Sequence, residues 1–277
     1  MSAFLFGTVG SPISTPAKPG GSVGAIRRLA ELRLSALELG WVQSVRVTEA
    51  TCAAIRAEGL KQNIAVSVHA PYFINLNASA EEWPKSRKRL MDAAYYGNLA
   101  GATDIVFHPG SYFGADSADV LAVAIPRLAE CIQELRDQGN PVILRPETMG
   151  KAAMLGSLED TLEMSRQIQG VLPCLDFAHL HARGGDGSMN SYDEFARILH
   201  VYAHVLGENS LQNLHIHLSG IEYSTKGEKN HLPIRESDLN ITELFKALRA
   251  FNCAGRILCE SPIMEDDALF MQELFSS

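Results

Sequence analysis

Short apolar segments recur along the chain and predict eight buried β-strands. Each segment is rich in Val, Ile, Leu and Phe and alternates little with polar residues, which is typical of parallel strands covered on both faces. The stretches between them repeat apolar residues at helical spacing instead. The predicted strands are residues 3–6, 36–39, 64–68, 104–107, 141–144, 173–175, 214–218 and 256–259. The predicted helices are residues 23–34, 50–58, 85–99, 118–138, 158–169, 192–206 and 241–251.

The alternation of eight strands with helices, at about 35 residues per unit, predicts a (β/α)8 barrel. We expect a single α/β domain, a TIM barrel over residues 1–277, because no low-complexity linker divides the chain. A doubly wound open sheet is the alternative, but such a sheet usually has fewer strands and a phosphate-binding loop after one of them. Pro126 falls inside the longest predicted helix, where we expect a kink or a new helix start.

Composition and charge are those of an ordinary soluble globular protein. The chain is 46% hydrophobic and 20% charged, which excludes disorder. Its net charge of −8 argues against binding nucleic acid by bulk positive charge, but not against a local metal site. The five Cys are widely spaced without a CxxC pair, as in a reducing compartment. With no signal peptide and no apolar stretch near the roughly 18 residues of a membrane span, we expect a cytoplasmic monomer that does not bind membranes.

Six of the predicted strands each deliver a His, Asp or Glu at the carboxyl end. Successive members are separated by 29 to 43 residues, about one strand–helix unit. Side chains that leave barrel strands at the same level converge on one mouth, where barrel enzymes carry out their chemistry. A lone residue of this kind is more often a hydrogen-bonded structural group, but six at the same end favour one site. The six residues are His69, His108, Glu147, Asp176, His217 and Glu260.

This set of side chains points to bound metal ions. Burying three carboxylates and three imidazoles together without a cation would cost more than the net stability of a domain. Imidazole and carboxylate ligands favour Zn²⁺, with Mn²⁺ or Fe²⁺ as alternatives. One catalytic zinc uses three or four ligands, so six ligands predict at least two metals, an arrangement suited to the hydrolysis of phosphate esters.

Six sequence blocks at these positions resemble the endonuclease IV family, the zinc-dependent class of apurinic/apyrimidinic endonucleases within the xylose isomerase-like barrels. The blocks are HAPYFINL at 69–76, FHPGS at 107–111, ETMG at 147–150, LDFAH at 175–179, HLSG at 217–220 and ESP at 260–262. Residues 145–150, with Arg-Pro before the Glu, resemble archaeal homologues more than bacterial ones. The resemblance implies a phosphodiesterase that cuts damaged double-stranded DNA 5′ to abasic sites in base excision repair.

The resemblance also implies a role for each of the six residues. Glu147 would bridge two metals as the catalytic residue, and His69 and His108 would complete one of the two sites. The other site would consist of Asp176, His217 and Glu260.

A third zinc site is implied less completely. His179 and His231 match two ligands of that site in the family, but Lys229 stands where the family has an Asp. Three alternatives follow from this departure. Glu228 replaces the Asp, Lys229 supplies positive charge in place of the metal, or the third site is empty.

The same resemblance implies four DNA contacts. Tyr72 and Phe73 match side chains that the family presses into DNA at the abasic gap, with packing at the barrel rim as an equal alternative. The family inserts an Arg from the loop after the second strand, where Trp41 would stack here. Ser111 matches a group near the phosphate, or else makes a local turn hydrogen bond.

Two other functions stay open at this stage. A sugar isomerase or epimerase on the same barrel would use metals to polarise a carbonyl, but such sites usually have more carboxylates and fewer His ligands. A non-catalytic nucleic-acid-binding relative is disfavoured by the intact set of ligands and the negative charge. His215 shares a strand face with His217 one layer deeper, so we predict a supporting hydrogen bond for it.

Overall fold

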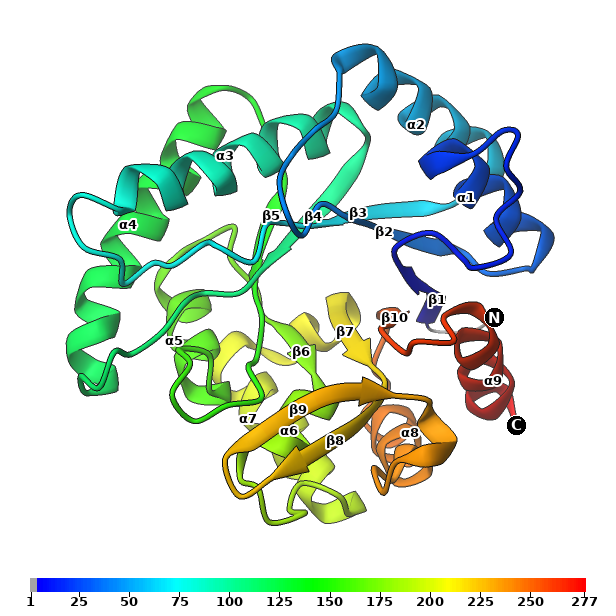
Figure 1. Cartoon of the computed structure of the whole chain (residues 1–277). Coiled ribbons are helices and arrows are strands. Elements are labelled where there is room, and N and C mark those ends of the chain that lie inside the picture. Colours follow the sequence, from blue (N-terminus) through cyan, green and yellow to red (C-terminus); the bar gives the residue numbers. More distant parts are fainter. Residues whose placement is uncertain (1–3) are drawn as a thin grey trace.

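Eight parallel strands form a barrel in the computed structural model of the protein, which describes residues 4–277 (Figure 1). Their order is β5-β4-β3-β2-β1-β10-β7-β6. Isolated parallel bridges from Leu144 to Val171 and from Glu147 to Cys174 connect the two end strands, so the barrel is nearly closed. The strands are β1 (Phe4–Val9), β2 (Ala36–Gly40), β3 (Ala65–His69), β4 (Ala102–Phe107), β5 (Ile143–Pro146), β6 (Cys174–Asp176), β7 (Leu214–Leu218) and β10 (Gly255–Cys259).

The predicted (β/α)8 architecture is confirmed, and each predicted strand overlaps an observed one. The first predicted strand began at Ala3, which lies outside the described residues. The seven predicted helices are present as well, and they cover the outside of the strands (Figure 1). These helices are α1 (Gly21–Glu31), α2 (Glu49–Gln62), α3 (Trp83–Leu99), α4 (Ser117–Asp137), α5 (Leu158–Gln167), α7 (Tyr192–Leu206) and α8 (Ile241–Ala250).

Helix α4 continues through Pro126, so the predicted new helix start at this residue was wrong. Pro126 lies on the exposed face of the helix, and so does Ala122, whose carbonyl loses its usual partner to the proline. Water can hydrate that carbonyl, which lowers the cost of a proline in the middle of a helix. Within residues 4–277, neither α4 nor any other helix is long and apolar enough to cross a membrane.

Several elements were not predicted. The most important is an antiparallel hairpin of β8 (Gly220–Ser224) and β9 (Gly227–Leu232), inserted between β7 and α8 and drawn in front of the barrel in Figure 1. Its residues are mostly polar, so the hydrophobic pattern predicted a loop. The backbone N–H of Glu228 donates to the Gly150 carbonyl at 2.9 Å, which anchors the hairpin beside the end of β5. The remaining elements are α6 (Phe177–Arg183), α9 (Glu265–Ser276) and the 3₁₀ turns η1 (Glu208–Asn213) and η2 (Ile234–Glu236).

The strands carry polar side chains into the barrel and apolar ones toward the helices. Residues two apart along an extended chain face the same side, so Arg145 in β5 and Glu147, the residue directly after β5, both point into the barrel. Arg145 contacts Asp104 within the barrel, while Glu147 lies at the carboxyl end of its strand. Phe6 of β1 packs outward, with its ring centroid 5.8 Å from that of Phe275 in α9. The hydrophobic core therefore lies between the strands and the helices. Ionisable side chains occupy the interior of the barrel.

Candidate metal centre

The carboxylate of Glu147 is the central group at the barrel mouth, and it is fully buried. Its Oε2 atom lies 3.3 Å from His69 Nε2 and 3.4 Å from His108 Nε2. Its Oε1 atom faces the other way, 3.4 Å from His217 Nδ1. One carboxylate thus contacts two separate sets of potential ligands, one with each oxygen, which is how a bridging carboxylate is arranged.

The six residues predicted from the strand ends come together in two groups that share Glu147. In each group, the candidate ligand atoms all lie within 4.8 Å of one another. His217 Nδ1 also lies 3.5 Å from Glu260 Oε1. The first group is His69, His108 and Glu147, and the second is Glu147, Asp176, His217 and Glu260.

The donor set fits divalent metal ions. Within the described part of the chain, Glu147 Oε2 and Asp176 Oδ2 are buried without a hydrogen-bond donor. Buried carboxylate oxygens normally have such a donor, because leaving one unmatched costs free energy. Imidazole nitrogens and carboxylate oxygens facing one another across 3 to 4 Å would be satisfied together by a cation placed among them.

Electrostatics at the centre compensate for the clustered carboxylates. Burial raises the pKa of Glu147, but the charge of His217 and hydrogen bonds from neighbouring imidazoles outweigh burial and hold the pKa well below its usual range. For Asp176, burial and repulsion from Glu260 outweigh attraction by His179 and raise the pKa to about 6. Protons on the imidazoles therefore balance part of the negative charge, and a metal ion would displace those protons.

A third group of potential ligands lies on α6 and the hairpin. His179 Nδ1 lies 2.9 Å from the Thr148 carbonyl, its nearest acceptor, which leaves Nε2 facing Glu228 Oε2 at 3.6 Å. That carboxylate oxygen is buried and has no hydrogen-bond donor within residues 4–277. The ring of His231 lies 5.4 Å from the ring of His179. Lys229 is about half exposed and instead contacts Glu222 at 2.9 Å. Glu228, not Lys229, is therefore the residue beside the imidazole of His179.

Glu38, a fully buried carboxylate in the barrel beneath the centre, was not among the residues predicted from the sequence. Its Oε2 atom accepts a hydrogen bond from Ser67 Oγ at 2.7 Å and lies 2.9 Å from His215 Nε2. His215 therefore makes the supporting hydrogen bond predicted for it. The sequence did contain one signal for it, because Glu38 is the single charged residue within the apolar predicted strand 36–39.

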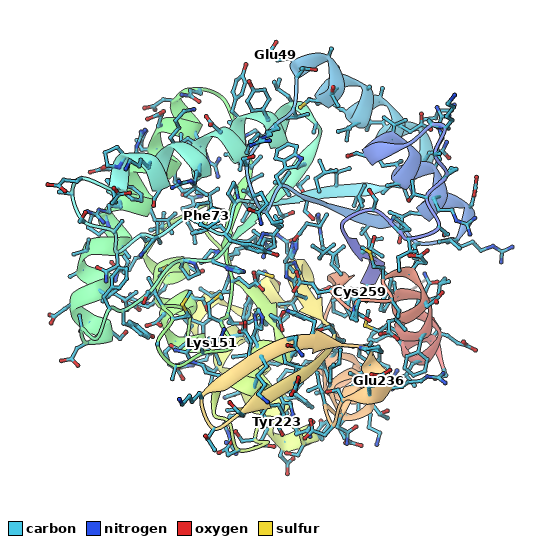
Figure 2. The ribbon with its side chains drawn as sticks, in the orientation of Figure 1. Glu49, Phe73, Lys151, Tyr223, Glu236 and Cys259 are labelled. Atoms are coloured by element: carbon cyan, nitrogen blue, oxygen red, sulfur yellow. The ribbon has the colours of Figure 1, made fainter. Side chains whose placement is uncertain are left out.

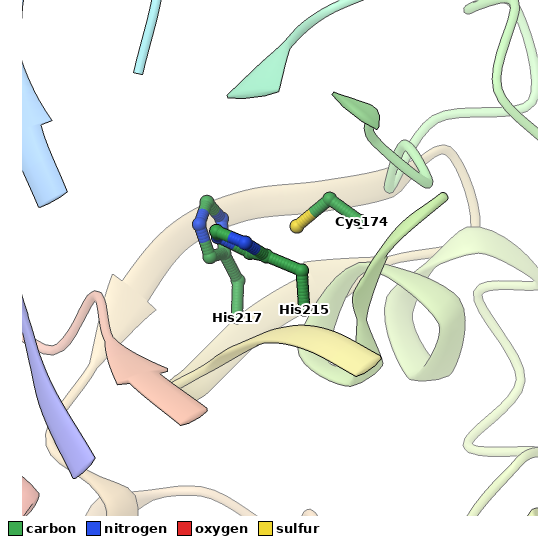
Figure 3. A group of neighbouring side chains, drawn as sticks. All are labelled: Cys174, His215 and His217. Atoms are coloured by element: carbon green, nitrogen blue, oxygen red, sulfur yellow. The ribbon is translucent and has the colours of Figure 1, made fainter. Parts of the chain in front are cut away.

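Cys174 lies in the same layer, and its sulfur points toward the rings of His215 and His217 (Figure 3). The candidate ligand atoms of these three residues lie within 4.8 Å of one another. Burial raises the pKa of the Cys174 thiol far above its usual range, so it is protonated in the absence of metal. Both imidazoles present Nε2 to Glu38, at 2.9 Å in each case. This layer is therefore a support beneath the centre.

The mouth of the barrel opens into a cavity of about 390 Å³. Tyr72 is 45% exposed at its rim, and its ring stacks on His108 with a centroid distance of 4.9 Å. Phe73, which is labelled in Figure 2, follows Tyr72 in the sequence. Its side chain is 57% exposed. The cavity is lined by Val9, His69, Tyr72, His108, His179, Glu228, His231 and Glu260.

The other two predicted DNA contacts lie on neighbouring loops. Trp41 is half-buried, packs against the hydrophobic core and donates its backbone N–H to the His69 carbonyl at 3.0 Å. The Ser111 hydroxyl donates to the Ala153 carbonyl at 3.1 Å, which ties the loop after β4 to the loop after β5. Neither residue belongs to the lining of the cavity.

Fold and side chains together define a (β/α)8 barrel protein whose mouth gathers histidines and carboxylates. Residues 26–274 match the xylose isomerase-like TIM barrel family, and the protein belongs to this family. The family expected from the sequence blocks is thereby confirmed.

Two relatives differ in how much of the chain they match. Uncharacterized protein MJ0133 of Methanocaldococcus jannaschii is 37% identical over 277 residues, covering 98% of this chain and 97% of that protein. Probable endonuclease 4 of Staphylococcus carnosus is 28% identical over 174 residues. That match covers 60% of this chain and 55% of the relative, so it spans about half of the endonuclease.

Solved structures share the fold over nearly the whole chain. Endonuclease IV from Thermus thermophilus has a TM-score of 0.69 at 21% identity and covers 97% of both chains. A D-tagatose 3-epimerase-like protein has a TM-score of 0.72 at 17% identity, covering 97% of this chain and 96% of that one. At these identities the likeness is one of fold, and it includes both a nuclease and an epimerase-like protein.

Proposed function

We propose that the protein is a zinc-dependent phosphodiesterase of the endonuclease IV type, which cuts double-stranded DNA 5′ to abasic sites. The observation that carries the proposal is the position of Glu147 between two ligand groups, each of which contains imidazole. A paired site of this kind suits phosphate-ester hydrolysis, because two cations can act on both the attacking and the leaving oxygen. The partial similarity to probable endonuclease 4 supports the same choice.

Each group would hold one metal ion, and Glu147 would contact both. Bound there, the ions would supply Lewis acidity and an activated water at neutral pH. His179, Glu228 and His231 would hold a third ion, with Glu228 taking the role that Lys229 cannot fill. Zn²⁺ suits this mixture of imidazole and carboxylate best, and Mn²⁺ is the alternative. Besides Glu147, the ion of the first group would be held by His69 and His108, and the ion of the second group by Asp176, His217 and Glu260.

The rim residues would bind and orient the DNA. Burial, together with the charge of Glu260, raises the pKa of Tyr72 to about 12, so its hydroxyl stays protonated and can donate a hydrogen bond. Phe73 offers an exposed apolar ring at the same rim, suited to stacking on an unpaired base. Trp41 and Ser111 would contact the flanking strand from adjacent loops.

The net charge of −8 shapes the expected interaction with DNA. A protein that lacks excess positive charge gains little from nonspecific phosphate contacts. Binding would therefore depend on the abasic site and the metal centre. We further propose that the protein acts in the cytoplasm as a monomer.

The test is a nicking assay on a duplex oligonucleotide with one stable abasic analogue, with Zn²⁺ or Mn²⁺ added. We expect a single cut 5′ to the analogue that leaves a 3′-hydroxyl, and no cut in the intact duplex. Glu147→Gln should abolish cutting. Glu58→Gln is the matched control, because Glu58 is a nearly buried carboxylate on α2 that pairs with Arg27. Absence of cutting with both metals, or full activity of Glu147→Gln, would refute the proposal.

A sugar epimerase or isomerase is the second candidate, favoured by one observation. The second ligand group contains three carboxylates and a single imidazole, a harder donor set that suits Mn²⁺ or Mg²⁺. Such an enzyme would need only this group. Elemental analysis separates the candidates, since two or more zinc ions per chain favour the nuclease and one manganese favours the epimerase.

A further inference from the structure

Glu38 lies directly beneath the metal centre and is held rigidly. It is fully buried in β2, with Ser67 Oγ at 2.7 Å and His215 Nε2 at 2.9 Å from its Oε2 atom. Both partners are themselves fully buried. A buried carboxylate with two fixed donors on one oxygen has little freedom to rotate. Its other oxygen, Oε1, is therefore aimed in one direction.

That direction leads to His217. Glu38 Oε1 lies 2.9 Å from His217 Nε2 as a buried ion pair, and within residues 4–277 neither atom has a hydrogen-bond partner that would compete with this contact. The opposite nitrogen of the same ring, Nδ1, faces Glu147 Oε1 at 3.4 Å and Glu260 Oε1 at 3.5 Å. The His217 ring thus connects Glu38 to the metal centre, because Nε2 faces Glu38 and Nδ1 faces the centre.

The two nitrogens of an imidazole cannot both be free for metal when one carries a proton. A carboxylate at one nitrogen favours the proton there and leaves the lone pair of the other nitrogen for a metal ion. Here Glu38 Oε1 lies 2.9 Å from Nε2, closer than Glu147 Oε1 at 3.4 Å and Glu260 Oε1 at 3.5 Å lie to Nδ1. The shorter contact favours the proton on Nε2, so the lone pair at Nδ1 faces the centre. The carboxylate also increases the basicity of the ring as a ligand.

We propose that Glu38 is a positioning residue of the metal centre, which holds the proton of His217 on Nε2 and thereby presents Nδ1 to the metal shared with Glu147. Ser67 and His215 support this role by fixing the orientation of Glu38. The proposal rests on the metal centre proposed above and concerns its second ligand group. Glu38 acts only through His217.

The first test uses the unaltered full-length protein loaded with Zn²⁺ and labelled with ¹⁵N at histidine. Long-range ¹H–¹⁵N spectra distinguish a ring that carries its proton on Nε2 from one that carries it on Nδ1. We expect His217, assigned by the ring signals that are missing from the spectrum of His217→Gln, to be protonated on Nε2 and bound through Nδ1. Zinc bound through Nε2 of His217 would overturn the proposal.

The second test measures Zn²⁺ affinity of the metal-free protein by competition with a chromogenic chelator. Loss of a carboxylate behind a metal-binding histidine typically weakens binding about 10- to 100-fold. We expect a loss of this size in Glu38→Gln and a smaller one in Ser67→Ala. Glu58→Gln is the control for a lost buried carboxylate away from the centre, and its affinity should stay within about twofold. Equal affinities of Glu38→Gln and Glu58→Gln would overturn the proposal.

The outcomes also separate this proposal from the proposed function. If the unaltered protein binds no Zn²⁺ or Mn²⁺, the metal centre fails and both proposals fall. If the unaltered protein binds zinc and cuts abasic DNA while Glu38→Gln binds equally well, only the role of Glu38 falls.

Discussion

The guanidinium Nε of Arg145 lies 2.6 Å from Asp104 Oδ1 inside the barrel, where the two residues are only 1% and 2% exposed. Arg256 approaches the other carboxylate oxygen at 2.9 Å. The remaining Arg145 nitrogens donate to the carbonyls of Pro173 and Asn213. A buried charge network is tolerated when its members are paired and hydrogen-bonded in this way. The network of Arg145, Asp104 and Arg256 occupies the interior of the barrel, on the same strand faces that carry the metal centre.

Removing the charge of Asp104 should destabilise the fold strongly. Asp104→Asn leaves two guanidinium groups facing an uncharged amide in the barrel, and breaking a buried pair of this kind costs about 3–5 kcal/mol. Asp92→Asn is the control, because Asp92 pairs with Lys88 on the surface of α3, where an ion pair contributes about 0.5 kcal/mol. Urea unfolding of both variants tests the difference. Equal losses would show that the buried network contributes no more than a surface pair.

The same carboxylate should make stability depend on acid pH. Burial raises the pKa of Asp104, but the charges of Arg145 and Arg256 outweigh it and hold the pKa below its usual range. A carboxyl group with a lowered pKa in the folded state stabilises the fold above its unfolded pKa of about 3.9, and this contribution is lost as pH falls toward the folded pKa. The difference in unfolding free energy between the wild type and Asp104→Asn should therefore be constant from pH 7 to 5 and shrink below about pH 4. A constant difference down to pH 3 would contradict this.

Metal removal should lower thermal stability, because the carboxylates of the centre then repel one another. At a free metal concentration about 100 times the Kd, binding stabilises the folded state by about 2.7 kcal/mol. For a chain of this size, that corresponds to roughly 5 to 10 °C in Tm. Differential scanning calorimetry before and after chelation measures the shift. Zn²⁺ should restore the Tm of the wild type but not that of Glu147→Gln, and recovery in both would place the stabilising metal elsewhere.

The number of bound metal ions should depend on Glu228 and not on its neighbour. Glu228 Oε2 faces His179 Nε2 at 3.6 Å, whereas Lys229 contacts Glu222. Elemental analysis of Glu228→Gln should show about one zinc fewer per chain than the wild type. Lys229→Gln is the adjacent control and should retain the wild-type content. The same content in all three proteins would mean that no ion is held by Glu228.

Tyr72 should contribute to recognition of abasic DNA. Stacking of a base on an aromatic side chain is worth about 1–3 kcal/mol, so Tyr72→Ala should weaken binding about tenfold or more. Tyr95→Ala is the control, because Tyr95 is similarly exposed but bonds to Glu49 on α2. Fluorescence anisotropy with abasic and intact duplexes measures both. If Tyr72→Ala lost the same affinity for the abasic and the intact duplex, Tyr72 would contact DNA in general and would not recognise the abasic gap.

The barrel could be predicted because its elements depend on local patterns. Buried parallel strands need apolar runs, and amphipathic helices need a spacing near 3.6 residues, so both appear in the sequence. The hairpin of β8 and β9 escaped prediction because it is polar and is held by contacts such as that between Glu228 and Gly150. Helix α6 escaped prediction because it begins directly after β6, at Phe177, and the side chain of Asp176 caps it by accepting the His179 backbone N–H at 2.7 Å.

The sequence by itself determined the alternation of strands and helices, and with it the residues that stand at the carboxyl ends of the strands. Tertiary structure decided how those residues meet. Each oxygen of Glu147 faces a different set of imidazoles, and Glu38 lies against His215, 177 residues away along the chain. Periodicity specifies which face of a strand a side chain occupies, but not which ring nitrogen points to the centre. That orientation depends on partners from other strands, which come together only when the barrel closes.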